Sequence, residues 1–320
     1  ELVEKFYLQG GKHLFLDEVH KYPTWSKELK EIYDLYPSMQ IVFSGSSLLN
    51  ILNADADLSR RCLPYNMYGL SFREFLMFYK NIRIPVASLE EVLRNAGEIC
   101  QGINEQCRPV QMFNEYLHDG YYPFFTGNRE DYYMNIENVV NFILEQEMPL
   151  LCGVAPAYVR KLKALLSILA SSVPYEVDIT KLAGIIGLTR NSVITYLQNL
   201  DRAELLKLLY SDLTSVKKMQ KPDKIYLQNP NLLYAIASTS VQISTARETF
   251  VMSQLSVNHE IEYGKAQGDF VVDHKYTFEV GGADKTFKQI ADLPDSFILA
   301  DNIEYATGKK LPLWIVGLTY

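Results

Sequence analysis

The chain has 320 residues, of which 48% are hydrophobic and 22% are charged, so it is long enough for two or three domains with apolar cores. Its formal net charge of −7 argues against a surface coated with nucleic acid, although it is compatible with a local basic patch. No apolar run reaches about 18 residues and no signal peptide is visible, which favours a cytoplasmic protein without a membrane partner.

The cysteine pattern argues against a zinc site and against a disulfide framework. The four cysteines are scattered along the chain and form no close pair: Cys62, Cys100, Cys107 and Cys152. Structural zinc sites and thioredoxin-like chemistry need closely spaced cysteines. We therefore expect reduced, partly buried thiols.

The first chemically informative stretch is HLFLDEVHKYPTW, residues 13–25. A predicted helix over residues 1–9 precedes it. Its apolar start leads straight into two carboxylates, as in a buried parallel strand, and ligands of open α/β sheets bind beyond such strand ends. There Asp17 can hold Mg²⁺ through its water shell, and Glu18 can orient or deprotonate an attacking water. The alternative is that both residues only cap the next helix.

Three segments together resemble a known family: LFLDEVHKYPTW, QIVFSGSS at residues 40–47 and YGLSFREF at residues 68–75. They are similar to the second half of the ATPase domain in a large prokaryotic group of the AAA superfamily. Proteins of this group carry a C-terminal domain of unknown function. The resemblance extends over essentially the whole chain, and it makes LFLDE the Walker B strand. It also implies ATP and Mg²⁺ as cofactors.

The resemblance implies two further sets of nucleotide-site residues. A helix is expected from about residue 24 to 36 and a second parallel strand over residues 40–43. In the family, a polar residue after that strand contacts the γ-phosphate or the attacking water, which makes Ser46 or Ser47 the sensor. The alternative is that these serines cap a helix that follows.

An arginine near residue 60 is the other element that the family implies. A guanidinium spreads positive charge over the transferring phosphoryl oxygens, so Arg60 and Arg61 are candidate finger or sensor residues. An arginine acting in trans requires a homo-oligomer, which is therefore an expected partner. The alternative is a solvated basic pair.

The phosphate loop G-x-x-x-x-G-K-[ST] does not occur in these 320 residues. In P-loop ATPases its backbone N–H groups cradle the phosphates, and its lysine reaches the β- and γ-oxygens. We therefore expect the chain to be an N-terminally trimmed piece of an ATPase that hydrolyses no ATP by itself. After the ATPase part, the sequence predicts a helix over residues 70–80 with Ser71 and Glu74 in a capping box. A helical lid or bridge follows it.

Residues 157–230 resemble a winged helix. Three helices are predicted, the second capped by Asp178 and ended at Gly187, the third capped by Thr189. Two strands, over residues 205–210 and 224–228, then flank a basic wing with Lys217, Lys218, Lys221 and Lys224. The third helix offers Arg190, Asn191, Ser192 and Gln198 to DNA, but Asp201 and Glu204 oppose binding. The alternative is a structural or protein-contact module.

The last segment resembles a restriction-endonuclease-like fold. A helix carrying Glu248 is followed by predicted strands over residues 260–263, 268–272, 276–280, 297–300 and 313–318, with a helix over 285–292. In that fold two carboxylates bind Mg²⁺ and a lysine steadies the transition state. Asp269 and Glu279 take the carboxylate positions and Glu248 is a third acid. Gly281 stands at the lysine position, and Lys285 is expected on the helix, so we expect a degenerate, non-cleaving domain.

The sequence thus predicts an α/β protein made of a partial P-loop ATPase domain with a parallel sheet and helical lid, a winged-helix domain and a nuclease-like α/β domain. The expected segments are residues 1–80, 81–153, 154–240 and 241–320. The main alternative is a nucleic-acid-processing protein that cuts DNA with Glu248, Asp269 and Glu279. A third possibility is a non-enzymatic scaffold.

Overall fold

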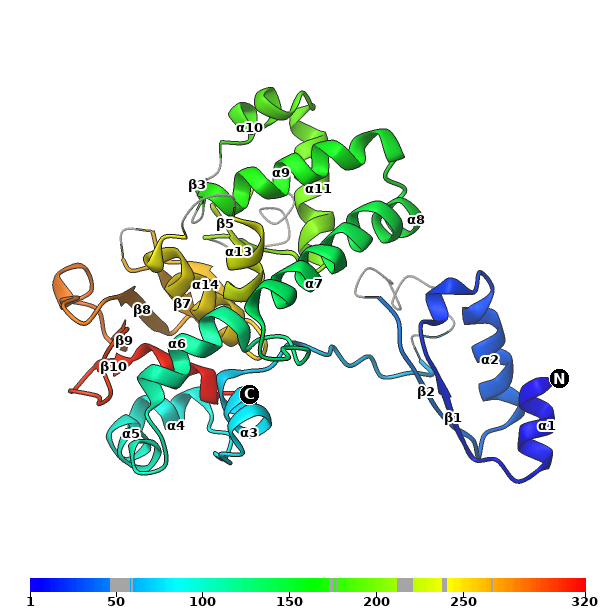
Figure 1. Cartoon of the computed structure of the whole chain (residues 1–320), viewed down its shortest axis with the longest axis horizontal. Coiled ribbons are helices and arrows are strands. Elements are labelled where there is room, and N and C mark those ends of the chain that lie inside the picture. The colour runs from blue at the N-terminus through cyan, green and yellow to red at the C-terminus, as the bar shows by residue number, and fades with distance from the viewer. Residues whose placement is uncertain are drawn as a thin grey trace. The chain divides into compact units, whose positions relative to one another are not determined.

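The computed structural model describes residues 1–46, 58, 60–172, 175–176, 178–211, 221–237, 241–265 and 267–320. These residues form helices and three sheets, which confirms the predicted α/β class. The chain divides into two compact units (Figure 1). Unit 1 comprises Glu1–Met67 and Glu145–Val154, and unit 2 comprises Tyr68–Leu144 and Ala155–Tyr320. Among the described helices, none has the length and apolar character needed to cross a membrane.

Unit 1 is built on the parallel strand pair that the sequence predicts. Strands β1 and β2 align from His13↔Gln40 to Leu16↔Phe43, and α2 connects them along one face of the sheet (Figure 1). The elements are α1 (Leu2–Leu8), β1 (His13–Leu16), η1 (Val19–Lys21), α2 (Trp25–Leu35) and β2 (Gln40–Phe43), with η2 (Ile143–Glu147) and α8 (Met148–Cys152) following unit 2's α7 in the chain.

The prediction that the first strand is buried is wrong. Phe15 is 73% exposed and Val42 is 56% exposed. Both lie on the face opposite α2, because the other face holds Phe43, whose ring lies 5.9 Å from that of Trp25. A parallel sheet is normally covered on both faces, and among the described residues α2 covers one face while Phe15 and Val42 stay exposed on the other.

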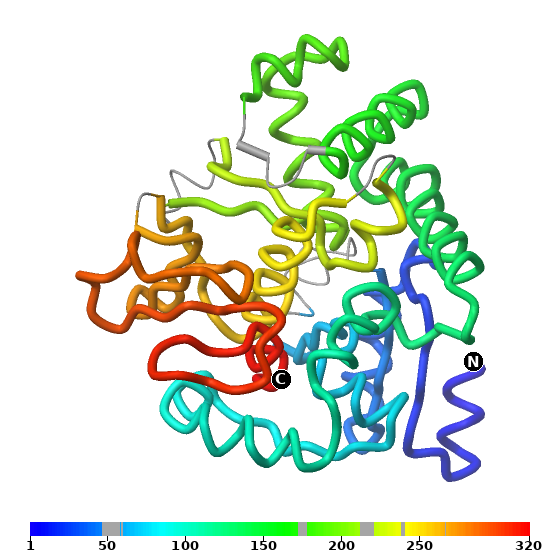
Figure 2. Tube along the Cα trace, turned by 60° about the vertical axis from the view of Figure 1, so that its left-hand side comes forward, coloured from blue at the N-terminus to red at the C-terminus, as the bar shows by residue number. Residues whose placement is uncertain are grey.

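The first part of unit 2 is helical and wraps the C-terminal segment. Its helices are α3 (Phe72–Lys80), α4 (Leu89–Arg94), α5 (Ala96–Asn104), α6 (Pro109–Asp119) and α7 (Arg129–Phe142). The predicted capping box is confirmed, since Glu74 N donates to Ser71 Oγ at 3.1 Å and Ser71 N donates to Glu74 Oε2 at 3.0 Å. The C-terminal segment, red in Figures 1 and 2, packs on α3 and α6 from the other end of the sequence.

A three-stranded antiparallel sheet follows, in the strand order β3-β5-β4. Its elements are α9 (Val159–Ser172), β3 (Tyr175–Glu176), α10 (Ile179–Ile186), α11 (Arg190–Arg202), β4 (Leu206–Leu209) and β5 (Lys224–Leu227), followed by α13 (Pro230–Ile236). The predicted caps are confirmed: Asp178 accepts from Thr180 N, Thr189 accepts from Ser192 N, and Gly187 has φ +67°. The predicted wing lysines Lys217 and Lys218 lie outside the described residues.

The last part of unit 2 is a five-stranded mixed sheet in the order β10-β9-β8-β7-β6. Strands β6, β7 and β8 form an antiparallel meander, and β9 and β10 add in parallel. The elements are α14 (Ile243–Leu255), β6 (Ile261–Tyr263), β7 (Phe270–Val272), β8 (Tyr276–Gly281), η4 (Phe287–Gln289), β9 (Ser296–Ala300), β10 (Lys310–Pro312) and η5 (Leu313–Leu318).

Two sequence predictions in this sheet are wrong. The expected strand over residues 313–318 is the 3₁₀ helix η5, and the expected helix over residues 285–292 shrinks to the single turn η4. All six residues of η5 are buried, against α3 and α14. A continuous apolar run has no period that distinguishes a strand from a helical turn, so the sequence could not decide between them.

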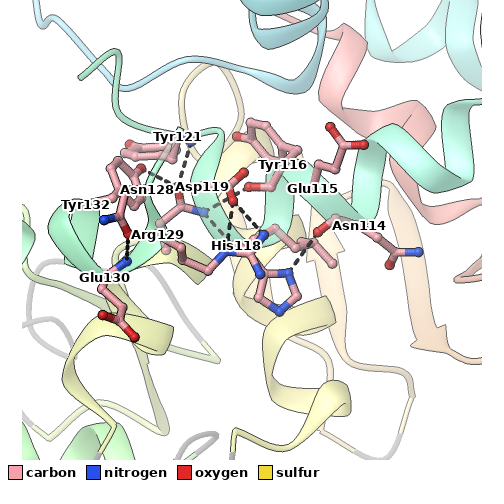
Figure 3. A network of polar contacts seen from close by, with 12 residues as sticks. Asn114, Glu115, Tyr116, His118, Asp119, Tyr121, Asn128, Arg129, Glu130 and Tyr132 are labelled. Atoms are coloured by element: carbon pink, nitrogen blue, oxygen red, sulfur yellow. Dashed lines mark hydrogen bonds and ion pairs between the residues drawn. The ribbon is translucent and has the colours of Figure 1, made fainter. Parts of the chain in front are cut away.

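A buried asparagine ties the helices of unit 2 together. Asn231 at the start of α13 is fully buried, and both polar atoms of its side chain form hydrogen bonds. Its Nδ2 donates to the carbonyl oxygens of Tyr116 and Leu117, both at 2.9 Å. Its Oδ1 accepts from Tyr121 N at 2.8 Å and from Tyr132 Oη at 2.6 Å. The same corner holds the buried Asp119, paired with Arg129 (Figure 3).

We predict that Asn231→Ala lowers the free energy of unfolding by about 3 kcal/mol or more, because it leaves several buried polar groups without partners. Urea denaturation followed by circular dichroism measures the change. The exposed Asn138 on α7 provides the control, and Asn138→Ala is expected to leave stability within about 0.5 kcal/mol of wild type. Equal effects of the two substitutions would contradict the role of Asn231.

A second prediction concerns pH. Burial raises the pKa of Asp201 from 3.8 to about 6, while Lys207 and the backbone N–H of Leu208 oppose the shift. Between these values the native state binds more protons than the unfolded chain, so the free energy of unfolding falls as the pH rises through that window. Asp201→Asn removes this titration and keeps an acceptor for Leu208. It should stabilise the protein at pH 7 by about 2 kcal/mol and flatten the curve between about pH 4 and pH 6.

Denaturant titrations across that pH range measure the effect. Asp292→Asn, at an exposed aspartate, is the control and is expected to leave the slope in place. A wild-type slope that survives in Asp201→Asn would show that another group causes it.

Candidate functional site

The carboxyl ends of β1 and β2 bring Asp17, Glu18 and Ser44 together. Ser44 follows β2 directly, and its backbone N–H donates to Leu16 O at 2.9 Å, which continues the parallel ladder by one residue. Its hydroxyl donates to Asp17 Oδ1 and accepts from Glu18 N at 3.1 Å. Its carbonyl accepts from Val19 N at 3.0 Å. Ser44 therefore fixes the turn that presents both carboxylates.

Sequence reasoning missed Ser44. It singled out Ser46 and Ser47 from the same SGSS segment because the resemblance places a sensor there. The available signal was register: in a parallel pair, the first residue after β2 lies opposite the first residue after β1, so Ser44 faces Asp17.

Glu18 has an unusual backbone conformation. Its φ of 50° lies in the left-handed region, which costs about 1 kcal/mol or more for a residue with a side chain. The carboxylate is about half exposed, pairs with Lys21, and borders an open pocket that Tyr22 and Trp25 also line. The turn therefore holds a strained residue at a solvent-accessible pocket beside Asp17.

Ser46 lies in a separate contact within unit 1. Its hydroxyl donates to Glu147 Oε2 at 2.8 Å, and its N–H donates to His20 Nδ1 at 3.3 Å. His20 Nε2 lies 3.9 Å from Glu147 Oε1. Ser46 is thus linked to η2, about a hundred residues along the chain. Ser47 lies outside the described residues.

The two candidate arginines are not brought to Asp17. Arg61 forms a bidentate pair with Asp34, with Nε–Oδ1 at 3.0 Å and Nη2–Oδ2 at 3.2 Å. Asp34 lies in the last turn of α2, which returns the chain to the start of β2, so this pair lies near the opposite end of the strands. Arg60 is exposed.

A second cluster of acidic residues lies in unit 2. Asp269 N donates to Phe278 O at 2.9 Å and Val280 N donates to Asp269 Oδ2 at 2.8 Å, which sets Asp269 beside Glu279 across β7 and β8. Glu279 is 2% exposed, and burial raises its pKa. One of its oxygens pairs with Lys285, while Oε2 is buried with no hydrogen-bond partner among the described residues.

Glu248 on α14 completes this carboxylate cluster. Tyr226 Oη donates to Glu248 Oε2 at 2.7 Å, and Lys224 Nζ lies 3.5 Å from the same oxygen. Burial, together with the charge of Asp269, raises the pKa of Glu248. Lys224 is only 8% exposed, so it belongs to this cluster and not to a solvated basic wing, which corrects the sequence interpretation.

Gly281 makes room for Lys285. A Cβ at Gly281 would lie 2.7 Å from Lys285 Cδ, so the lysine side chain folds back over the glycine and reaches Glu279. The expectation that Lys285 lies on a helix is wrong, because it precedes η4. Lys285, four residues after the expected lysine position at Gly281, therefore forms an ion pair with the Glu279 carboxylate.

The cluster does not fit the Mg²⁺ that the nuclease-like resemblance implies. Lys224 and Lys285 already pair with Glu248 and Glu279, two of the three acids. An ammonium group that close repels a divalent cation and competes for the same oxygens. We therefore derive no metal-dependent cleavage from this arrangement.

Comparison with known proteins finds a family match that includes the residues of the first site. Residues 1–76 match a family described as an AAA domain, and residues 110–242 match a domain of unknown function (DUF8612). An uncharacterized protein of Methanocaldococcus jannaschii, MJ1637, is 28% identical over 217 residues, 66% of this chain. The chain matches 45% of that protein's length. No solved structure matches. The N-terminal part of the chain is thus similar to AAA-type ATPases.

Proposed function

We propose that the chain is part of an AAA-type ATPase in which Asp17 and Glu18 form the Walker B pair. The observation that carries this proposal is the turn in which Ser44 bonds both to the Asp17 carboxylate and to the Glu18 backbone, at the carboxyl edge of two parallel strands. Nucleotides bind at this edge in α/β ATPases. The AAA-domain match over residues 1–76 includes all three residues.

The two carboxylates have different surroundings and hence different roles. Asp17 is oriented by the Ser44 hydroxyl, which suits a residue that holds the water shell of Mg²⁺. Glu18 is paired with the exposed ammonium group of Lys21 at an open pocket, so its carboxylate can turn to an attacking water. Mg²⁺–ATP, when bound, supplies the transferable phosphoryl group. These 320 residues contain no phosphate loop, so the proposal assigns them the Walker B and water-orienting roles and not the phosphate cradle.

The contacts of Ser46 and the arginines refine this proposal. Ser46 senses the state of the nucleotide through Glu147 and His20, which links the site to η2. Arg60, which is exposed, serves as the arginine finger of a neighbouring subunit in a homo-oligomer, whereas Arg61 holds Asp34. The site residues do not identify the cellular process that ATP turnover drives.

The experiment is ATP turnover by the longest protein that the gene encodes, compared with its Glu18→Gln variant. The variant should bind ATP but hydrolyse it about 10²- to 10⁴-fold more slowly, because the amide cannot take a proton from water. Glu31→Gln, at an exposed glutamate of α2, is the matched control and should turn over ATP as wild type does. Equal turnover by Glu18→Gln and wild type would remove Glu18 from the mechanism, and absence of ATP binding by the wild type would remove the ATPase proposal.

A second function is favoured by the order of elements from α9 to β5. An order of helix, strand, two capped helices and two antiparallel strands supports a winged-helix module. Arg190 and Asn191 are exposed at the start of α11, where a recognition helix would meet base edges. We infer that this module binds DNA through α11.

Binding to a duplex measured at several salt concentrations tests this inference. Arg190→Ala should weaken binding about tenfold and reduce the slope of log K against log salt by about 1. Arg202→Ala changes an exposed arginine at the far end of the same helix and is the control. If both variants bind like wild type, α11 is not the contact surface.

A further inference from the structure

We propose that Lys224 is an internal cation for the carboxylate cluster Glu248, Asp269 and Glu279, and that it keeps this cluster closed to divalent metal ions. The proposal goes beyond the ATPase function and does not depend on it, because all these residues belong to unit 2. In the nuclease-like fold, a divalent metal ion supplies the positive charge between such carboxylates. Here we assign that charge to Lys224.

Lys224 is enclosed by groups that favour a cation. Its Nζ lies 3.5 Å from Glu248 Oε2 and 4.7 Å from the centre of the Tyr263 ring, and the side chain is 9% exposed. A cation over an aromatic face is attracted by the ring's negative charge density. Tyr226, two residues along the same strand, donates its hydroxyl hydrogen to the same oxygen of Glu248. Strand β5 therefore supplies both a charge and a hydrogen bond to one carboxylate.

Lys224 and Lys285 come from the chain segments of different sheets in unit 2. Lys285 follows β8, the strand that carries Glu279, and so belongs to the five-stranded sheet's own segment of the chain. Lys224 comes from the three-stranded sheet and reaches Glu248 on α14, which packs against both β5 and β8. The cluster is thus completed by a residue from outside the nuclease-like segment, which the sequence motif could not include.

Charge balance explains why the lysine is needed. Asp269 lies beside Glu279 and its charge acts on Glu248, so with all three acids ionised the ammonium groups of Lys224 and Lys285 leave one negative charge in excess. Burying a carboxylate without a counter-charge is costly, so each ammonium group stabilises the folded state. In the wild-type protein, the described residues contain no group of three His, Cys, Asp or Glu side chains placed to hold a metal ion.

Removing the charge of Lys224 should therefore open a metal site at Glu248 and Asp269, while Lys285 stays paired with Glu279. Glu248 Oε2 would lose its cation, and the cluster would carry two excess negative charges instead of one. Carboxylate oxygens are the ligands that Mg²⁺ and Mn²⁺ prefer. The chemical class of the new ligand is thus a hard divalent cation, and Mn²⁺ is the probe because its free concentration can be measured by electron paramagnetic resonance.

The experiment compares Mn²⁺ binding and melting temperature in wild type and Lys224→Met. Wild type should show no Mn²⁺ binding that depends on Glu248, and no rise in melting temperature with Mn²⁺. Lys224→Met should bind one Mn²⁺ at least about tenfold more tightly than wild type and should melt higher when Mn²⁺ is present. The double variant Lys224→Met/Glu248→Gln should lose both effects. Binding by wild type that equals the variant, or binding that survives in the double variant, would overturn the proposal.

Lys207→Met is the matched control. Lys207 lies in β4 of the same sheet, its side chain is 15% exposed, and it pairs with Glu204 at 2.9 Å, so it is a similar lysine whose acidic neighbours, Glu204 and Asp201, lie outside the Glu248 cluster. Its variant should gain no Mn²⁺ binding, and a gain as large as that of Lys224→Met would also overturn the proposal. If Lys224→Met does not fold, Lys224→Gln replaces it. Glutamine keeps a donor for Glu248 and removes the charge, so the same outcomes apply.

Discussion

The packing of unit 2 depends on the four hydrogen bonds of Asn231. The chain from Tyr116 to Tyr132 turns from α6 into α7, and this turn buries carbonyl and N–H groups at the end of a helix. Asn231 binds the carbonyls of Tyr116 and Leu117, the N–H of Tyr121 and the Tyr132 hydroxyl, and the Tyr116 carbonyl also accepts from Gly120 N. Asn231 lies on α13, which contacts α6, α7 and α14. Its hydrogen bonds therefore hold α6 and α7 in place relative to α14, the helix that carries Glu248.

At both acidic sites, a polar partner from another element sets the position of the acid. Ser44 bonds to the exposed Asp17 and to the Glu18 backbone, and Lys224 and Tyr226 bond to Glu248, which is mostly buried. In each case the partner comes from a different element than the acid. The position of a carboxylate is therefore set by a residue that lies far away in the sequence.

This explains which features could be predicted from the sequence. Local signals sufficed for the parallel strands β1 and β2, and for the helix caps at Ser71, Asp178 and Thr189, because each depends on neighbours within a few residues. Features without a local sequence signature could not be predicted. Neither Lys285 folding over Gly281 nor Lys224 facing Glu248 has a local signature, and the apolar run of η5 lacks a period.

The two acidic sites differ in how their charge is balanced, and this difference separates their chemistry. At the first, Glu18 is about half exposed and pairs with Lys21, three residues away on the surface, an interaction that water screens strongly. In the proposed ATPase, a cation and a nucleotide arriving from solvent can therefore replace it. At the second, the side chains of Glu248 and Glu279 are 13% and 3% exposed, and lysines from two parts of the chain reach them. Displacing those lysines requires local unfolding or rearrangement, because the low dielectric that surrounds the pairs strengthens them. The first site is thus organised for exchange with solvent, whereas the second carries its own cation.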